Sequence, residues 1–280
     1  MTILVTTPNG KVGSEVVKGL LARNIPVRVA AHTVSKAQPG AEVVPFAFEN
    51  EDQVQAALQG VTALYMATIN DTTLEDQNRL VDLAKAAGVQ RIVRLSAAGV
   101  ENSDAPLRKN ELYIEASGIP YTILRPTWFM QNYSTGSAAS IQNGVIAEPS
   151  GDGKTSFIDT RDIAEVAIAA LTQDGHRGKA YHLTGGEALN RYQVAELISQ
   201  AVGFPVKYTP VTDDEHRAAM QNYIPADYLE FLIMLYGGIR EGWTEVVSQD
   251  VNQVLGRPPI TFAQFAQDYK EVWSQPETVK

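Results

Sequence analysis

The first seventeen residues of the chain combine a buried strand, a turn and the start of a helix. Residues 3–5 (ILV) form a continuous apolar run, which is typical of a strand covered on both faces in a parallel sheet. The turn residues Pro8, Asn9 and Gly10 follow, and apolar residues then return at helical spacing from Val12 to Leu21. This order predicts an α/β fold in which a helix N-terminus follows the end of a parallel strand, the position at which such folds bind a pyrophosphate.

The glycine pattern of this turn is incomplete. In the G-x-x-G-x-x-G spacing of short-chain dehydrogenases, the three positions fall on Thr7, Gly10 and Gly13, so the first glycine is missing. In the G-x-G-x-x-G spacing the first position falls on Pro8. Gly10 lets the backbone approach a phosphate and Gly13 lets helix and strand pack closely. Thr7 can still fit if the turn keeps a negative φ there, but its side chain then crowds the cofactor side. The alternative is an ordinary strand-turn-helix unit that binds no ligand.

The composition narrows the classes of function. A net charge of -9, with no run rich in Lys or Arg, argues against nucleic-acid binding and against an anionic membrane surface, so any phosphate site must be local. The chain contains no cysteine, which excludes disulfides and thiol catalysis and fits a cytoplasmic enzyme. No secretory leader or membrane-spanning run is visible. The four histidines are scattered without ligand spacing, so we expect no metal site.

Short apolar runs alternate with amphipathic segments along the first half of the chain. We expect strands at 25–31, 42–48, 63–68, 90–96 and 121–124, and helices at 51–58, 74–87 and 108–116. This alternation predicts a Rossmann-type, doubly wound parallel sheet, in which the loops at the carboxyl ends of the strands share one crevice. We expect a dinucleotide-binding domain at 1–150. Residues 151–280 should form a small, mainly helical C-terminal part that completes the sheet and closes over the substrate.

The end of the second expected strand bears on the choice of cofactor. An acidic residue at this position binds the ribose 2′-hydroxyl of NAD, whereas basic residues accommodate the 2′-phosphate of NADP. The chain has no acidic residue between Ile25 and Ala41 but offers His32, Ser35 and Lys36. The sequence therefore favours NADP(H) over NAD(H), although a solvated loop is the commoner place for such residues.

Several longer segments together resemble one family. They are KAAGVQRIVRLSAAGV (85–100), ELYIEASGIPYTILRPTWFMQN (111–132), SFIDTRDIAEVAIAAL (156–171), AYHLTGGEALNRYQVAELIS (180–199) and GRPPITFAQFAQD (256–268). The chain resembles the NmrA-like group of atypical short-chain dehydrogenases over nearly its whole length. Its later segments are most similar to the branch that contains festuclavine dehydrogenase, an iminium reductase, and its bacterial relatives.

The resemblance implies a set of cofactor-binding residues. The pyrophosphate loop would comprise Thr7, Asn9, Gly10, Lys11 and Val12. His32 would lie at the adenosine phosphate, where close relatives usually carry Arg, with Lys36 nearby. Ala67 and Thr68 would form the loop beside the nicotinamide ribose, and Ser96 would lie at the strand end near the nicotinamide ring. Pro126 would belong to the segment that passes the nicotinamide face.

The catalytic pair of ordinary short-chain dehydrogenases has no counterpart at the expected positions. Aligned through Glu111, the Lys of the Tyr-x-x-x-Lys pair falls on Leu107 and the Tyr on Ser103, and neither can transfer a proton. Lys109, Glu111 and Tyr113 remain as candidates on one helix, of which Lys109 and Tyr113 share a face. The alternative is a solvated helix surface with an ordinary salt bridge. A hydride acceptor that is already activated, such as a quinone or an iminium, needs little or no proton donation from the protein. The missing Tyr-Lys pair therefore does not exclude redox chemistry and argues only against an alcohol dehydrogenase.

The aromatic region after residue 126 indicates a small-molecule substrate. We assign Thr127, Phe129, Asn132 and Tyr133 to the substrate pocket and the other aromatic residues to packing. The expected activity is an NAD(P)H-dependent reduction of a planar, electron-poor compound of the quinone or iminium type, by a monomer or homodimer. The alternatives are a non-catalytic dinucleotide-binding redox sensor that acts through a protein partner, and an enzyme of this fold with a non-redox reaction.

Overall fold

A computed structural model of the chain describes residues 1–31, 39–69 and 71–274. Two compact units interleave along the sequence. The first unit contains Met1–Pro126, Thr160–Leu183 and Asp250–Arg257, and the second contains Thr127–Asp159, Thr184–Gln249 and Pro258–Lys280. The expected division into domains at residue 150 stays a prediction, and it differs from the division into these two units. The units differ from it because the chain leaves the sheet after Pro126 and returns to it with a later strand.

The first unit is built on a parallel sheet. Within the described residues, seven strands pair in the order β3-β2-β1-β4-β5-β6-β8, and every pair is parallel. The strands are β1 (Ile3–Thr6), β2 (Val27–Ala31), β3 (Glu42–Pro45), β4 (Ala63–Met66), β5 (Arg91–Leu95), β6 (Tyr121–Pro126) and β8 (Lys179–Leu183). This arrangement confirms the expected doubly wound sheet. The strand order reverses between β1 and β4, so the loops that follow these two strands flank the point where such sheets bind ligands.

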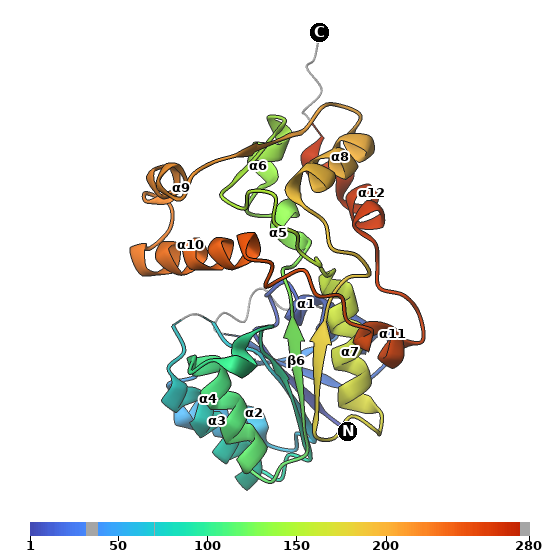
Figure 1. Ribbon diagram of the computed structural model, residues 1–280. Coiled ribbons are helices and arrows are strands. Elements are labelled where there is room, and N and C mark those ends of the chain that lie inside the picture. Colours follow the sequence, from blue (N-terminus) through green and yellow to red (C-terminus); the bar gives the residue numbers. More distant parts are fainter. Residues whose placement is uncertain (32–38, 70, 275–280) are drawn as a thin grey trace. The chain divides into compact units, whose positions relative to one another are not determined.

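Helices cover both faces of this sheet (Figure 1). The helices of this unit are α1 (Gly13–Ala22), α2 (Glu51–Leu58), α3 (Leu74–Ala86), α4 (Pro106–Ala116), α7 (Thr160–Thr172) and α11 (Asp250–Leu255), with a 3-10 turn η2 (Val100–Asn102). Figure 1 shows α2, α3 and α4 together on one side and α1 with α7 on the other. Because both faces are covered, the central strands β1 and β4 are buried along their whole length.

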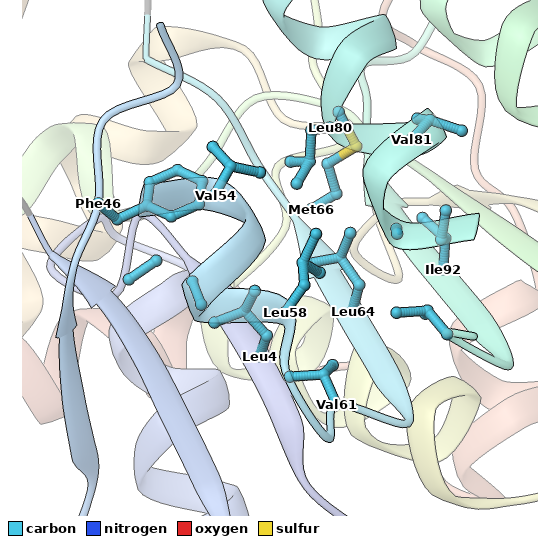
Figure 2. Packing of buried hydrophobic residues seen from close by; sticks show 14 of the residues in the cluster. Leu4, Phe46, Val54, Leu58, Val61, Leu64, Met66, Leu80, Val81 and Ile92 are labelled. Carbon is cyan, nitrogen blue, oxygen red and sulfur yellow. The ribbon is translucent and has the colours of Figure 1, made fainter. Parts of the chain in front are cut away.

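The hydrophobic core under α2 and α3 holds these helices against the sheet. Side chains from β1, β4 and β5 meet those of the two helices in one buried cluster. Figure 2 shows how they interdigitate, with Leu4, Leu64, Met66 and Ile92 from the strands and Val54, Leu58, Leu80 and Val81 from the helices. Burial of a leucine or isoleucine side chain contributes about 1.5–3 kcal/mol, so this cluster fixes the strands whose ends form the site.

The second unit is mainly helical. Its helices are α5 (Gln131–Ser134), α6 (Ala138–Gln142), α8 (Arg191–Val202), α9 (Asp213–Met220), α10 (Ala226–Arg240) and α12 (Phe262–Trp273), and a parallel pair is formed by β7 (Val145–Glu148) and β9 (Lys207–Pro210). An aromatic core that includes Phe157, Phe262 and the fully buried Trp273 holds α8 against α12. No helix in the described part of the chain is both long and apolar enough to span a membrane.

Candidate dinucleotide site

Thr6 joins the two loops at the point where the strand order reverses. Its side chain is fully buried; the hydroxyl donates to the carbonyl of Ala67 at 2.6 Å and accepts from the amide of Ala67 at 2.9 Å. These bonds hold the end of β1 beside the end of β4. The loop that begins at Thr7 and the expected ribose loop, Ala67 and Thr68, are therefore neighbours. Thr6 is missed by reasoning from the sequence, where it is only the last residue of a buried strand.

Thr7 has a left-handed backbone conformation, with φ of 51°. The condition under which the sequence would accommodate Thr7, a negative φ, is therefore not met. The carbonyl of Thr7 accepts the Gly10 amide at 3.0 Å, and a Cβ on Gly13 would lie only 2.3 Å from the same oxygen. The turn therefore directs the Thr7 carbonyl toward the start of α1, which requires the conformation that glycine usually supplies.

The loop residues lie at the start of α1. Asn9, Gly10 and Lys11 are exposed, whereas Val12 is buried beneath them. Val12 is the N-cap, and its apolar side chain makes no hydrogen bond to the helix. A cradle in which a side chain at Gly13 is excluded, next to an N-terminus with partial positive charge, fits a dinucleotide pyrophosphate.

Ser96 and Pro126 lie at the adjoining strand ends. The Ser96 amide donates to Leu124 at 2.7 Å, and the Ala98 amide donates to Pro126 at 3.0 Å, so the loop after β5 follows β6 to its end. The Ser96 hydroxyl is buried and lies near enough to Glu111 to lower the pKa of that carboxyl group. It makes no hydrogen bond of regular geometry with a described residue.

Glu111 accepts hydrogen bonds from two arginines. Its fully buried carboxylate accepts from Arg125 Nε at 3.1 Å, from Arg125 Nη2 at 2.7 Å and from Arg108 Nη1 at 2.8 Å. Burial acts to raise the pKa of Glu111, but the hydrogen bonds from Arg125 and Arg108 outweigh it and hold the pKa below its usual value. Glu111 is therefore an anion that accepts hydrogen bonds and cannot supply a proton at neutral pH.

The other two candidates on α4 do not converge with Glu111. Lys109 is exposed. The hydroxyl of Tyr113 donates to both carboxylate oxygens of Asp82 on α3, at 2.9 and 2.8 Å, and this hydrogen bond raises the pKa of Tyr113. Since Glu111 is bound to β6 and Tyr113 to α3, the helix does not present the three groups to one substrate.

Arg94 is a buried cation in the middle of the sheet that the sequence reading missed. The guanidinium donates to the carbonyl of Met66 at 3.3 Å, to Gln77 Oε1 at 2.9 Å and to Thr68 Oγ1 at 3.5 Å. Burial lowers the pKa of Arg94 to about 10, so it stays charged at neutral pH. It braces the loop that carries Ala67 and Thr68. The signal in the sequence is a charged residue between the apolar Val93 and Leu95 of a central strand.

His32 and Lys36, the expected contacts to an adenosine phosphate, lie outside the described residues. The expected substrate residues Thr127, Phe129, Asn132 and Tyr133 belong to the second unit. Thr127 is buried and its hydroxyl donates to the Ser156 carbonyl at 2.5 Å, while Phe129 and Asn132 are half-buried.

Tyr133 lies in the core of the second unit. Its ring packs edge to face against Phe157 and Phe262, with ring centroids 5.5 and 5.6 Å away, and only 2% of the residue is exposed. Burial raises the pKa of its hydroxyl. The structure thus gives Tyr133 a packing role and leaves Phe129 and Asn132 as the partly accessible members of the expected substrate set.

Several known proteins are similar to this chain over nearly its whole length. The chain is 34% identical to a (4-alkanoyl-5-oxo-2,5-dihydrofuran-3-yl)methyl phosphate reductase of Streptomyces griseus, over 97% of this chain and 99% of that protein. It is 33% identical to an NAD(P)H azoreductase of Xenophilus azovorans, over 94% and 96% of the two chains. Among solved structures, an NADPH-dependent quinone oxidoreductase of Escherichia coli in complex with NADPH is 26% identical, with a TM-score of 0.83 over 96% of this chain and 99% of that one.

The family model for NmrA-like proteins matches residues 1–237, which include the dinucleotide loop, β6 and the expected substrate segment. The chain therefore belongs to the NmrA-like family.

Proposed function

We propose that the protein is an NAD(P)H-dependent reductase. The observation that carries this proposal is the loop after β1, in which the Thr7 carbonyl excludes any side chain at Gly13, next to the start of α1 and at the switch point of a parallel sheet. The reductases among the relatives support the same conclusion. When bound, the nicotinamide would supply a hydride, and the chain would orient it.

The substrate we propose is planar and electron-poor, of the quinone or iminium type. Two candidate proton donors on α4 do not have a proton available for a substrate. Glu111 is an anion that accepts hydrogen bonds from arginines, and the Tyr113 hydroxyl donates its proton to a hydrogen bond with Asp82. A substrate that accepts hydride without prior protonation suits such a site. The azoreductase and the quinone oxidoreductase among the relatives are named for electron-poor acceptors, which supports this class.

We infer that NADP(H) is preferred over NAD(H). This inference rests on the sequence alone, which offers His32 and Lys36 and has no acidic residue between Ile25 and Ala41. We also propose a cytoplasmic protein that acts on a small molecule as a monomer or homodimer, in keeping with the absence of cysteine from the sequence.

The test is oxidation of NADPH and NADH in the presence of a panel of acceptors: a quinone, an iminium compound, an azo dye and a simple ketone. We expect turnover with at least one of the first three and none with the ketone, which needs a proton donor. Gly13→Ala should abolish turnover, and Gly136→Ala serves as the control. Turnover of the ketone alone, or activity that survives Gly13→Ala, would contradict the proposal.

One observation favours a second candidate, a redox sensor that binds a protein partner. Helix α10 carries the apolar side chains of Tyr228, Phe231 and Met234, of which 42%, 49% and 50% are exposed, so other residues of the second unit do not cover them. Exposed apolar side chains clustered on one helix are typical of an interaction surface. Tight binding of NADPH without reduction of any acceptor in the panel would favour the sensor over the reductase.

A further inference from the structure

Thr7 occupies its position against two local preferences. A β-branched residue with a φ of 51° is a conformational outlier, because its Cβ substituents crowd the backbone. Thr7 also precedes Pro8, and the residue before a proline is driven toward extended conformations. Strained residues of this kind persist where the side chain or the backbone has a task that outweighs the cost.

The backbone task does not require a threonine. The contacts that define the turn are made by the Thr7 carbonyl, which accepts the Gly10 amide at 3.0 Å and faces Gly13. Glycine or asparagine would present the same carbonyl and would adopt a left-handed conformation with less strain. The backbone contacts therefore do not explain why this position carries a threonine side chain.

The Thr7 hydroxyl lies beside the open face of the loop. Its Oγ1 atom is 3.9 Å from the point that a Cβ on Gly10 would occupy, and the residue is partly exposed. Within the described part of the chain, this hydroxyl makes no hydrogen bond. Gly10 is the residue at which the backbone can approach a phosphate, so a group in that space comes within reach of the hydroxyl.

We propose that the Thr7 hydroxyl donates a hydrogen bond to a phosphate oxygen of the bound dinucleotide. This proposal rests on the proposed function and assigns a residue that sets affinity at the same site. The hydrogen bond to a charged oxygen offsets the strain of a threonine where the usual pattern has glycine.

The test compares the dissociation constants of NADPH for the unaltered protein, Thr7→Val and Thr7→Ser by titration calorimetry. Thr7→Val keeps the branched side chain and its strain but removes the hydroxyl, so we expect binding about tenfold weaker, equivalent to about 1.4 kcal/mol. Thr7→Ser keeps the hydroxyl and should bind within about twofold of the unaltered protein. Thr7→Ala provides a second variant without the hydroxyl should Thr7→Val fail to fold.

The outcomes separate this role from the function on which it rests. Equal affinity of Thr7→Val and the unaltered protein would overturn the role of the hydroxyl while leaving the dinucleotide site in place. An equal loss in Thr7→Ser and Thr7→Val would also overturn it, since the hydroxyl would then not be what matters. Absence of binding by the unaltered protein would refute the proposed function itself.

Discussion

Replacing Glu111 with glutamine tests the buried charge cluster at the end of β6. The carboxylate is fully buried and accepts three hydrogen bonds, two of them from Arg125 in a bidentate arrangement. Glutamine has the same shape but no charge, and its NH2 group would face arginine donors. Removal of one partner of a buried ion pair costs about 3–5 kcal/mol, because the other charge is left uncompensated. We therefore expect Glu111→Gln to lower the free energy of unfolding by about 3–5 kcal/mol.

Glu115 provides a matched control on the same helix. It also accepts from Arg108, at 2.8 Å, but its side chain is 31% exposed, so solvent screens the pair. Glu115→Gln should lower the free energy of unfolding by less than about 1 kcal/mol. Urea unfolding followed by circular dichroism gives both values. Similar costs for the two variants would refute the argument that burial, and not pairing alone, determines the contribution of Glu111.

The pH dependence supplies a second check on the same variant. The pKa of Glu111 is lower in the folded protein than its ordinary value of 4.5, so its stabilisation is fully present above that value and is lost as the pH falls through the folded pKa. The difference between Glu111→Gln and the unaltered protein should be constant from about pH 5 to 8 and shrink below about pH 4. A difference that grows in acid would contradict the assigned ionisation.

Three further predictions concern the site. Gly13→Ala should destabilise the protein by about 1–3 kcal/mol and weaken dinucleotide binding at least about tenfold, since its Cβ would lie 2.3 Å from the Thr7 carbonyl. Gly136→Ala, where the nearest atom is 3.8 Å from a Cβ, should change neither quantity; equal effects of the two in urea unfolding and calorimetry would refute the packing argument. Tyr113→Phe should retain kcat within about twofold and lose about 1 kcal/mol of stability with its hydrogen bond, whereas a large loss of kcat at unchanged stability would make Tyr113 the proton donor. Arg94→Lys should lower the free energy of unfolding by about 1–3 kcal/mol, because one ammonium cannot reach all the acceptors of the guanidinium, and an unchanged unfolding curve would show that the brace is dispensable.

Local burial patterns are sufficient to predict the parallel sheet. The helix expected at 51–58 is α2 (Glu51–Leu58), and the helix expected at 74–87 is α3 (Leu74–Ala86). The strands expected from apolar runs are all present within a few residues, because a strand buried in a parallel sheet is mostly apolar. The return of the chain to the sheet in β8 is anticipated only as a C-terminal part that completes it. The short pair β7 and β9 is not anticipated, since each of these strands has only one buried residue, Ile146 and Tyr208, and so leaves no apolar run.

The chemistry of the site is harder to predict because it depends on contacts between distant residues. The sign of φ at Thr7 follows from where its carbonyl must point, which a sequence pattern does not encode. The ionised state of Glu111 follows from Arg125, fourteen residues away. Tyr113 shares a helix with Glu111, yet its hydroxyl is bound to Asp82 on another helix, so spacing along one helix does not place the two groups in one site.

The measurement that tests the central claim most directly is titration calorimetry of the protein with NADPH, NADP, NADH and NAD. The account predicts binding with micromolar dissociation constants, tighter for the phosphorylated forms, and loss of that binding in Gly13→Ala but not in Gly136→Ala. Absence of binding to all four dinucleotides would contradict the assignment of the loop after β1 as a cofactor site, and the reductase proposal would fail with it.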